Sequence, residues 1–335
     1  MSTYYIGLKL GSTTTCIYKA GNGIVLKEPS LIAMPTNPKI KDVKAIGINA
    51  KKLIGKVSDN ITIFSPISNG TIQYEELAIY MLKGFLKKIF TTKSIGQNIK
   101  AILCVPLGLS PQEKKQFEIT CFKAGIAEVF VVPDVLCYAV GNGINLQSES
   151  ANLIVNIGGD TTNIAVVSNF SIVKGYNLAI GGSIINVAIA KYIEETYSMN
   201  ISNDQAELIK LEICSLLENY NATIEILGFN TRTQTQETIT ISSSELYPIV
   251  YHYYSKISDA ILSIIQSCDP SVVTDISKNG IYYYGNATSM IGFEKFITKQ
   301  TSFKANLTEN NRSNILGTGE LIKYPQLLKK ILKNC

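Results

Sequence analysis

The sequence is poor in the residues from which metal centres and nucleophilic active sites are usually built. Among 335 residues there is one histidine, His252, and none of the seven cysteines forms a CxxC pair. Zinc sites need several closely spaced Cys and His ligands, so no metal site of that kind is predicted. A lone histidine also provides no Ser-His-Asp or Cys-His set, and we interpret it as a helix-face residue. The scattered cysteines are typical of reduced core thiols in a cytoplasmic protein.

Long apolar runs and a strong charge imbalance are also missing. No apolar run approaches the roughly 20 residues that a membrane-spanning helix needs, and the N-terminus shows no signal-peptide pattern. The chain has 31 Lys and Arg against 26 Asp and Glu, a net charge of +5, with no dense basic block interleaved with aromatics. Nucleic acid is therefore not an expected partner. If the protein contacts a membrane, we expect it to do so only at the membrane surface.

What the sequence does contain is a mixture of strand and helix patterns in a chain long enough for two domains. Hydrophobic residues make up 46% of it. Short β-rich runs bounded by turn residues predict strands at 5–8, 16–18, 23–26, 101–105, 128–132, 153–157, 163–167, 223–229, 238–242 and 280–284. Apolar residues at helical spacing predict helices at 75–89, 183–197, 204–217 and 244–266. Ser110, Pro111 and Glu113 form a capping-box pattern that starts a further helix, which ends at Gly125.

One stretch of the first half recurs in the second half of the chain. Residues 9–15, Lys-Leu-Gly-Ser-Thr-Thr-Thr, match residues 156–162, Asn-Ile-Gly-Gly-Asp-Thr-Thr. Each copy has a strand, a glycine-containing turn and a threonine-rich strand. Such turns offer several backbone N–H groups in a small arc that binds phosphate oxygens. The duplication predicts an α/β protein of two similar lobes, with the two turns facing each other across a polyphosphate.

With these two matched turns, the chain resembles the MreB branch of the actin, sugar-kinase and DnaK-type chaperone superfamily. The resemblance covers nearly the whole chain, in family order and spacing. It is carried by the runs GNGIVLKEPSLIAM, AIGINAKKLIGKVSDNITIFSPISNGTI, VPLGLSPQEKKQFEITCFKAG, NLIVNIGGDTTNIAVVS, SIVKGYNLAIGGSIINVAIAKYIEETYSMNIS, AELIKLEI and NILGTGELI.

The resemblance implies an actin-like, ribonuclease H-like fold of two lobes, each with a core and a small outer subdomain. It places the first lobe at 1–145, with core 1–32 and 67–145 and outer subdomain 33–66. The second lobe is expected at 146–310, with core 146–181 and 244–310 and outer subdomain 182–243, and 311–335 returns to the first lobe. The implied ligand is ATP, with GTP as the alternative. The implied assembly is a head-to-tail filament beneath the cytoplasmic membrane that contributes to cell shape, with other MreB-like proteins and membrane shape proteins as further partners.

The resemblance also assigns roles to individual positions. The residues of the two phosphate turns would be Gly11, Ser12, Thr13, Gly158, Gly159, Asp160 and Thr161. The nucleoside contacts would be Glu207, Lys210, Gly285, Asn286 and Ala287. Glu113 falls where MreB-like proteins place a carboxylate that orients the attacking water, although its place in a capping box explains it equally well.

Several positions depart from the family pattern. Lys9 and Asn156 stand where the family has the aspartates that hold hydrated Mg²⁺, so Mg²⁺ loses its protein anchors, with Asn156 left only as a ligand through water. Asp160 replaces a glycine and places a negative charge near a phosphate. In the linker at the end of a strand, the family has the acidic pair Glu-Glu-Pro, and this chain has Pro133-Asp134-Val135. We hypothesise that Lys9 supplies part of the missing metal charge, by touching a phosphate or by pairing with Asp160; the alternative is a decayed, empty site.

Other functions stay open at this level. The alternatives to a filament protein are a non-polymerising phosphotransferase, a chaperone-like ATPase, and a pseudo-ATPase paralogue that co-assembles with an active MreB. Two basic and apolar segments are candidates for contact with an anionic membrane, namely 87–95 and the amphipathic tail 325–333. The usual expectation for such a tail is that it packs its leucines on its own domain, with the lipid surface as the alternative.

Overall fold

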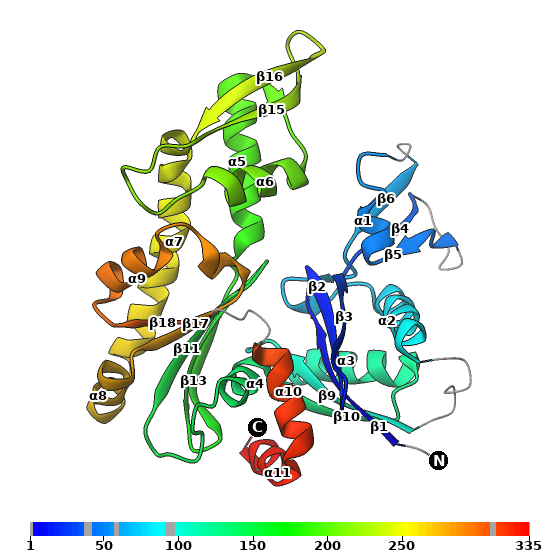
Figure 1. The fold of residues 1–335 in the computed structure, drawn as a ribbon, viewed down its shortest axis with the longest axis vertical. Helices are drawn as coiled ribbons and strands as arrows, with labels where there is room; N and C mark the ends of the chain where they lie inside the picture. The colour runs from blue at the N-terminus through cyan, green and yellow to red at the C-terminus, as the bar shows by residue number, and fades with distance from the viewer. Residues whose placement is uncertain (1–2, 37–41, 57–59, 91–97, 309–312, 335) are drawn as a thin grey trace. The chain divides into compact units, whose positions relative to one another are not determined.

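The computed structural model describes residues 3–36, 42–56, 60–90, 98–308 and 313–334 (Figure 1). The chain divides into two compact units. Unit 1 holds residues 1–150, 165–175 and 310–335, and unit 2 holds residues 151–164 and 176–309. The lobe and subdomain boundaries drawn from the sequence remain predictions.

Unit 1 is built on a five-stranded sheet in the order β10-β9-β1-β2-β3. Strands β1 and β2 are antiparallel, as are β2 and β3, whereas β1 pairs with β9, and β9 with β10, in parallel. The strands are β1 (Thr3–Leu10), β2 (Thr14–Lys19), β3 (Gly23–Pro29), β9 (Asn98–Val105) and β10 (Glu128–Pro133). The hairpin of β1 and β2 therefore carries the first phosphate turn at one end of this sheet.

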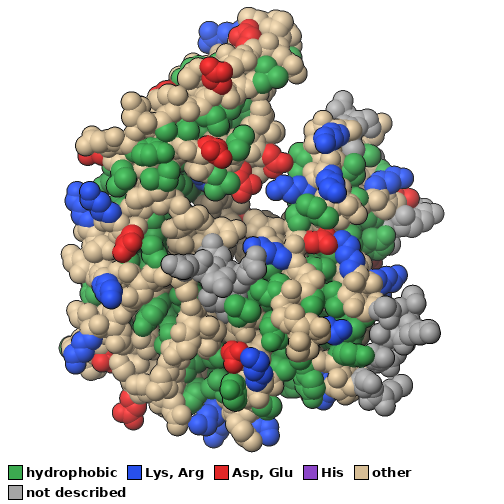
Figure 2. Space-filling view, viewed as in Figure 1, with side chains coloured by type: hydrophobic (Ala, Val, Ile, Leu, Met, Phe, Trp, Pro, Cys, Tyr) green, Lys and Arg blue, Asp and Glu red, His purple; other side chains and the backbone are tan. Residues whose placement is uncertain are grey.

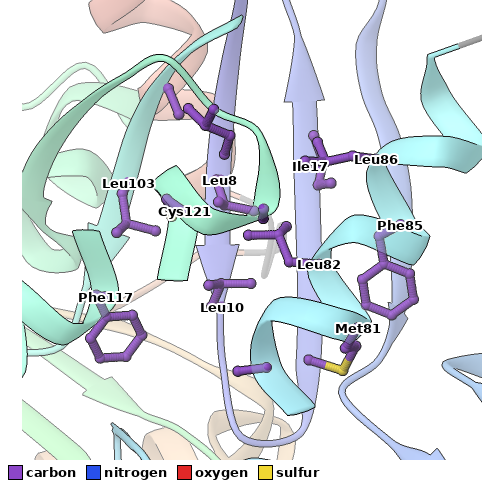
Figure 3. Packing of buried hydrophobic residues seen from close by; sticks show 14 of the residues in the cluster. Leu8, Leu10, Ile17, Met81, Leu82, Phe85, Leu86, Leu103, Phe117 and Cys121 are labelled. Carbon is purple, nitrogen blue, oxygen red and sulfur yellow. The ribbon is translucent and has the colours of Figure 1, made fainter. Parts of the chain in front are cut away.

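Helices cover both faces of this sheet. On one face lie α2 (Glu75–Ile89) and α3 (Pro111–Ala124), and on the other lie α4 (Asp134–Gly141) and α10 (Ser313–Lys323) (Figure 1). The larger core lies under α2 and α3. Figure 3 shows it as a cluster of buried apolar side chains from the sheet and the two helices, including Leu8, Leu10, Ile17, Met81, Leu82, Phe85, Leu103 and Phe117.

The second sheet repeats the arrangement of the first. Its order is β13-β12-β11-β17-β18, so that β11, β12, β13, β17 and β18 stand in the places of β1, β2, β3, β9 and β10. The parallel pairs β11–β17 and β17–β18 match β1–β9 and β9–β10. The strands are β11 (Asn152–Ile157), β12 (Thr162–Ser168), β13 (Ser171–Leu178), β17 (Ile281–Tyr284) and β18 (Ala305–Leu307). The predicted duplication is therefore confirmed.

Smaller sheets and further helices complete the two units. Unit 1 adds β4 (Ile32–Pro35), β5 (Ala45–Ile46), α1 (Ile48–Lys51), β6 (Ile61–Phe64), β7 (Ile67–Ser68), β8 (Thr71–Ile72) and α11 (Pro325–Asn334). Unit 2 adds α5 (Gly182–Tyr197), β14 (Met199–Asn200), α6 (Asn203–Ile213), β15 (Thr223–Asn230), β16 (Thr235–Ser242), α7 (Ser243–Gln266), α8 (Pro270–Asn279), the 3₁₀ turn η3 (Asn286–Ser289) and α9 (Phe293–Thr301).

Local sequence signals account for most of these boundaries, with one error. Helix α3 begins after a complete capping box and ends at Gly125 in the left-handed conformation, as predicted. The predicted helix at 204–217 is too long at its end, because α6 ends at Ile213. Cys214 is extended, and Ser215 forms a parallel bridge with Ile291. Pairing with a distant segment therefore replaces the last helical turn.

The segments singled out for membrane contact are largely packed on their own unit. In α11 the side chains of Leu328 and Ile331 are buried, as expected for a tail that packs on its own domain. Phe90 is buried too, and Ile89 packs against the main core. Lys93 and Ile95 lie outside the described residues. In the described part of the chain, no helix has the length and apolar character to cross a membrane. Figure 2 shows basic and acidic side chains interspersed on the face in view.

A half-buried carboxylate network joins α5 to the start of α7. Glu245 accepts hydrogen bonds from the Ser242 amide at 3.0 Å and the Ser242 hydroxyl at 2.6 Å, and also from the hydroxyls of Tyr192 and Tyr197. The bond to Glu245 raises the pKa of Tyr197 to about 12, with burial adding to the effect.

This pKa shift predicts a loss of stability at high pH. An unfolded tyrosine loses its proton at about pH 10, so between about pH 10 and pH 12 the folded state binds more protons than the unfolded state. The free energy of unfolding therefore falls as the pH rises through this window. Denaturant unfolding of Tyr197→Phe should show a shallower decline than the parent protein. Tyr176→Phe, at an exposed tyrosine of the same unit, is the control, and equal slopes in all three proteins would contradict the prediction.

Candidate functional site

The two phosphate turns have the same internal geometry. In the first, the Gly11 amide donates to the Thr14 carbonyl at 3.2 Å, and in the second the Gly158 amide donates to the Thr161 carbonyl at 2.9 Å. A Cβ on Gly11 would lie 2.9 Å from the Thr14 oxygen, and one on Gly158 would lie 3.0 Å from the Thr161 oxygen. Both turns are therefore closed so tightly that a side chain at the first position would press against the carbonyl oxygen of the fourth residue.

A buried threonine follows each turn and fixes it to the rest of its unit. The Thr15 hydroxyl shares a hydrogen bond of 2.8 Å with that of Ser30, and the Thr162 hydroxyl donates to the Ile180 carbonyl at 2.7 Å. In the first turn, the Ser30 amide also donates to the Thr13 carbonyl at 3.1 Å. The side chains of Ser12 and Thr13 stay at least partly exposed, so the turn can meet a ligand.

Lys9 lies beside the first phosphate turn. It is the penultimate residue of β1, and its Cε is 3.9 Å from the position that a Cβ on Gly11 would take. Its strand neighbours are Cys16 and Cys104. Cys137 of α4 is also near: burial raises the pKa of the Cys137 thiol well above its ordinary value, and the Lys9 charge acts in the opposite direction. The lysine is therefore close enough to the turn to act on a phosphate bound there.

These cysteines agree with the prediction of reduced core thiols. None of the six cysteines in the described residues is in a disulfide, and five of them are buried. Cys335 lies outside the described residues.

The second turn is joined to the N-terminus of α5. The Gly182 amide donates to the Gly158 carbonyl at 3.0 Å, and the Ser183 amide donates to the Gly159 carbonyl at 2.7 Å. The Ser183 hydroxyl donates to Asp160 Oδ1 at 2.9 Å. The first amides of the helix are thus satisfied by the turn itself, and the Asp160 carboxylate has a donor within unit 2.

The predicted nucleoside residues are partly brought together in unit 2. A pocket between α5, α6, α7 and the segment after β17 is lined by Gly182, Lys210, Leu211, Cys214, Tyr254, Asn286, Ala287, Ser289, Met290 and Ile291. It contains three of the predicted nucleoside residues, namely Lys210, Asn286 and Ala287. Glu207 is one helical turn before Lys210 on α6, half-buried, and acts electrostatically on the lysine.

Gly285, the first of the predicted nucleoside residues 285–287, is held in a conformation that other residues rarely adopt. Gly285 has φ +105°, and a Cβ there would lie 2.2 Å from the Ile157 carbonyl oxygen and 2.7 Å from Asn156 Oδ1. The 3₁₀ turn that follows is fixed by the Tyr254 hydroxyl, which donates to the Ala287 carbonyl at 2.5 Å. Asn156, itself buried, therefore lies against the nucleoside motif.

Glu113 is engaged in its own helix cap. Its Oε2 accepts from the Ser110 amide at 2.7 Å and from the Ser110 hydroxyl at 2.8 Å, while its own amide donates back to the Ser110 hydroxyl at 3.2 Å. This geometry accounts for the residue structurally. A role in orienting water stays a prediction.

The donor set does not fit a protein-anchored Mg²⁺ ion. The ammonium group of Lys9 has no lone pair to offer, and Asn156 has only a neutral amide oxygen. Among the described residues, no group of three or more His, Cys, Asp or Glu side chains is arranged to hold a metal ion. Hard divalent cations prefer carboxylate and phosphate oxygens, and neither Lys9 nor Asn156 supplies a carboxylate.

Sequence reasoning missed several residues of the unit 2 pocket. Cys214, just after α6, lies four positions after Lys210 and three after Leu211, so helical periodicity could have placed it beside each of them. Tyr254, Gly182 and Ile291 come from segments far apart in the sequence. No local signal identifies them, because only the packing of α5 and α7 against α6 brings them to the pocket.

Two duplicated sheets, each with a closed phosphate turn, define an actin-like protein, and comparisons with known proteins agree. The family model for MreB/Mbl protein matches residues 3–330. The chain belongs to the MreB/Mbl family, so the resemblance, the fold class and the family-level function predicted from the sequence are confirmed.

Individual relatives match along almost their whole lengths. The chain is 28% identical over 308 residues to the cell shape-determining protein MreB of Escherichia coli (strain K12), covering 91% of this chain and 89% of that protein. It is 27% identical over 327 residues to the cell shape-determining protein Mbl of Bacillus subtilis (strain 168), covering 97% of each.

Solved structures show the same fold. Crystalline MreB5 of Spiroplasma citri bound to ADP superposes with a TM-score of 0.89 at 26% identity, over 98% of both chains. The same protein bound to AMPPNP gives a TM-score of 0.88. A MamK double helical filament matches with a TM-score of 0.80 at 15% identity, covering 96% of this chain and 99% of that one, which speaks for the fold alone.

Proposed function

We propose that this protein binds an adenine nucleotide and assembles with copies of itself into filaments that contribute to cell shape. The observation that carries the proposal is the pair of equivalent phosphate turns, closed by the same Gly-to-Thr backbone hydrogen bond. Backbone amides in such turns are suited to phosphate oxygens. Support also comes from MreB5, which was solved with ADP and with AMPPNP.

The pocket on unit 2 is small, about 30 Å³, so a nucleoside would lie across its rim and not inside it. Leu211, Met290 and Ile291 present apolar surface to a planar base, and the exposed Asn286 offers an amide at the rim. Ligand pockets commonly combine apolar walls with a few polar groups that set orientation. ATP is the preferred ligand on family grounds, with GTP as the alternative, and the base pocket is the part of the molecule that would separate them.

Lys9 takes over charge that a metal would otherwise supply. Placed beside Gly11, its ammonium group would neutralise phosphate charge from the side of the first turn, so binding should need little Mg²⁺. Without carboxylate anchors for a metal, and with Glu113 held in its cap, fast hydrolysis is not expected. The protein would then assemble on binding nucleotide and turn over slowly.

Titration calorimetry with ADP and ATP, each with and without Mg²⁺, tests the nucleotide part. The wild-type chain should bind in both conditions. Lys9→Met should weaken Mg²⁺-free binding about tenfold, since a charged hydrogen bond contributes about 1.5–3 kcal/mol. Lys27→Met, at an exposed lysine of the same sheet, should change nothing. Absence of binding in all four conditions would overturn nucleotide binding, and equal affinity of Lys9→Met and wild type would overturn the role of Lys9.

Pelleting and negative-stain microscopy test the assembly part. Filaments of the isolated protein with nucleotide support the proposal, which rests on membership of the MreB/Mbl family. Persistent monomers would favour a phosphotransferase or a chaperone-like ATPase. Filaments that form only when an active MreB is added would instead identify a co-assembling paralogue, for which the replacements Lys9 and Asn156 are the motivating observation.

On the same family grounds we propose that the protein works in the cytoplasm beneath the membrane. The buried Leu328 and Ile331 leave the tail helix without a free apolar stripe, so sedimentation with anionic vesicles is expected to be weak for the monomer. Strong vesicle binding by the monomer would contradict this expectation.

A further inference from the structure

The second phosphate turn carries a carboxylate of its own. Asp160 stands in the second copy of the repeat where the first copy has Thr13. It is half-buried, and the Ser183 hydroxyl donates to its Oδ1 at 2.9 Å. The backbone amides of such a turn are suited to phosphate oxygens. A ligand phosphate and a protein carboxylate are therefore brought to the same small site.

The N-terminus of α5 holds this carboxylate in place. The N-cap residue of the helix, Gly181, has no side chain to offer, and the first turn at 182–185 contains no acidic residue. Helix N-termini favour negative charge because of the helix dipole. Ser183, the second residue of α5, is the donor to Asp160. Asp160 thus supplies, from outside the helix, the anion that this helix end favours.

The turn and the helix end are packed directly against each other. The Gly182 and Ser183 amides donate to the Gly158 and Gly159 carbonyls at 3.0 Å and 2.7 Å. A Cβ on Gly181 would lie 2.4 Å from the Gly159 carbonyl oxygen. The first two amides of the helix and the Ser183 hydroxyl are therefore all used within unit 2. A phosphate bound at this turn would meet the Asp160 carboxylate and would not displace it.

We propose that Asp160 is a specificity-determining residue, which disfavours the nucleoside triphosphate and so makes the site select the diphosphate. This inference rests on the proposed nucleotide binding. Repulsion from a fixed carboxylate grows with the charge of the ligand, and the triphosphate carries more negative charge than the diphosphate. ADP and ATP share the same base, so contacts at the unit 2 pocket do not separate them.

Titration calorimetry of the full chain with ADP and ATP, without Mg²⁺ and at low ionic strength, tests this selectivity. The wild type should bind ADP about fivefold more tightly than ATP, which is the effect of one unit charge at about 4 Å in water. Asp160→Asn removes the charge but keeps an oxygen that can accept from Ser183. It should bring the two affinities to within about twofold. Added salt should reduce the preference of the wild type in the same direction, without any substitution.

Two further variants separate the charge from a structural role. Ser183→Ala removes the hydrogen bond and keeps the carboxylate, so it should retain the preference for ADP even where both affinities fall. Asp259→Asn, at an exposed acidic residue of α7 in the same unit, changes the net charge equally and should leave both affinities unaltered. Lys9, beside the first turn, is the same in every variant.

The remaining outcomes contradict the inference or its basis. A wild type that prefers ATP, or an ADP-to-ATP affinity ratio that Asp160→Asn leaves unchanged, overturns the inference while nucleotide binding stands. Loss of the preference in Ser183→Ala also overturns it, because Asp160 would then act only by holding the helix. If neither the wild type nor Asp160→Asn binds either nucleotide, the proposed function itself fails, and the inference falls with it.

Discussion

Replacing Gly285 with alanine is expected to lower the free energy of unfolding by about 4 kcal/mol, the sum of backbone strain and overpacking. The position has φ +105°, and the new methyl group would lie 2.2 Å from the Ile157 carbonyl oxygen and 2.7 Å from Asn156 Oδ1. Neither neighbour can move freely, because Ile157 ends a buried strand and Asn156 is itself buried. Denaturant unfolding would measure the loss.

The same substitution should abolish nucleotide binding, since it displaces the turn that carries Asn286 and Ala287 into the pocket. Gly23→Ala is the control for backbone strain alone, because Gly23 has φ +77° and a Cβ there would meet nothing within 4 Å. It should cost about 1–2 kcal/mol. If Gly285→Ala matched the control in stability and kept full ADP affinity, the close approach of β17 to β11 would not be what shapes this pocket.

Replacing Gly317 with alanine should destabilise unit 1 by about 3 kcal/mol, even though alanine is the better helix former. Gly317 lies within α10, where a Cβ would come 1.8 Å from the Cys137 carbonyl oxygen and 3.0 Å from the Gly141 amide nitrogen, both on α4. These are backbone atoms, so the two helices would have to separate. Thermal unfolding should therefore begin at a lower temperature.

Gly84→Ala in α2 is the matched control for this substitution. There the new methyl group meets only the end of the flexible Ile46 side chain, at 2.2 Å from Cδ1. A rotamer change at Ile46 can relieve the contact, so helix propensity should offset much of the cost, leaving a change within about 1 kcal/mol. Equal effects at the two glycines would show that the contact between α10 and α4 is not rigid.

The unusual feature of the site is its charge. At the end of β1 a lysine stands where the family has an acidic residue, and at the end of β11 stands a neutral amide. Lys9 places a positive charge beside the first turn, and Asp160, held by Ser183 in unit 2, places a negative charge in the second turn. Nucleotide affinity should therefore depend on salt more than on Mg²⁺, since exposed charge interactions are screened within about 10 Å at 0.1 M.

Much of the architecture could be predicted from the order of residues alone. The helix at 75–89 and the strands at 223–229 and 238–242 follow from apolar spacing and turn residues. Their bounds agree with α2 and β15, whereas β16 begins three residues earlier than predicted, at Thr235. The capping box at Ser110 defines the start of α3 because its hydrogen bonds join residues three apart. The end of α6 could not be predicted, because Ser215 leaves the helix to pair with Ile291, about 75 residues further along the chain.

By itself, then, the sequence determined the two matched turns, the family and the identity of the charges at the site. These depend on residue type and on short-range spacing, which the chain carries with it. The tertiary structure alone decided where the two lysines point, Lys210 towards α5 and Lys9 towards Gly11, whereas the local capping box already places Glu113. A long side chain can reach several partners from one position. The packing of distant segments decides which of these partners it contacts.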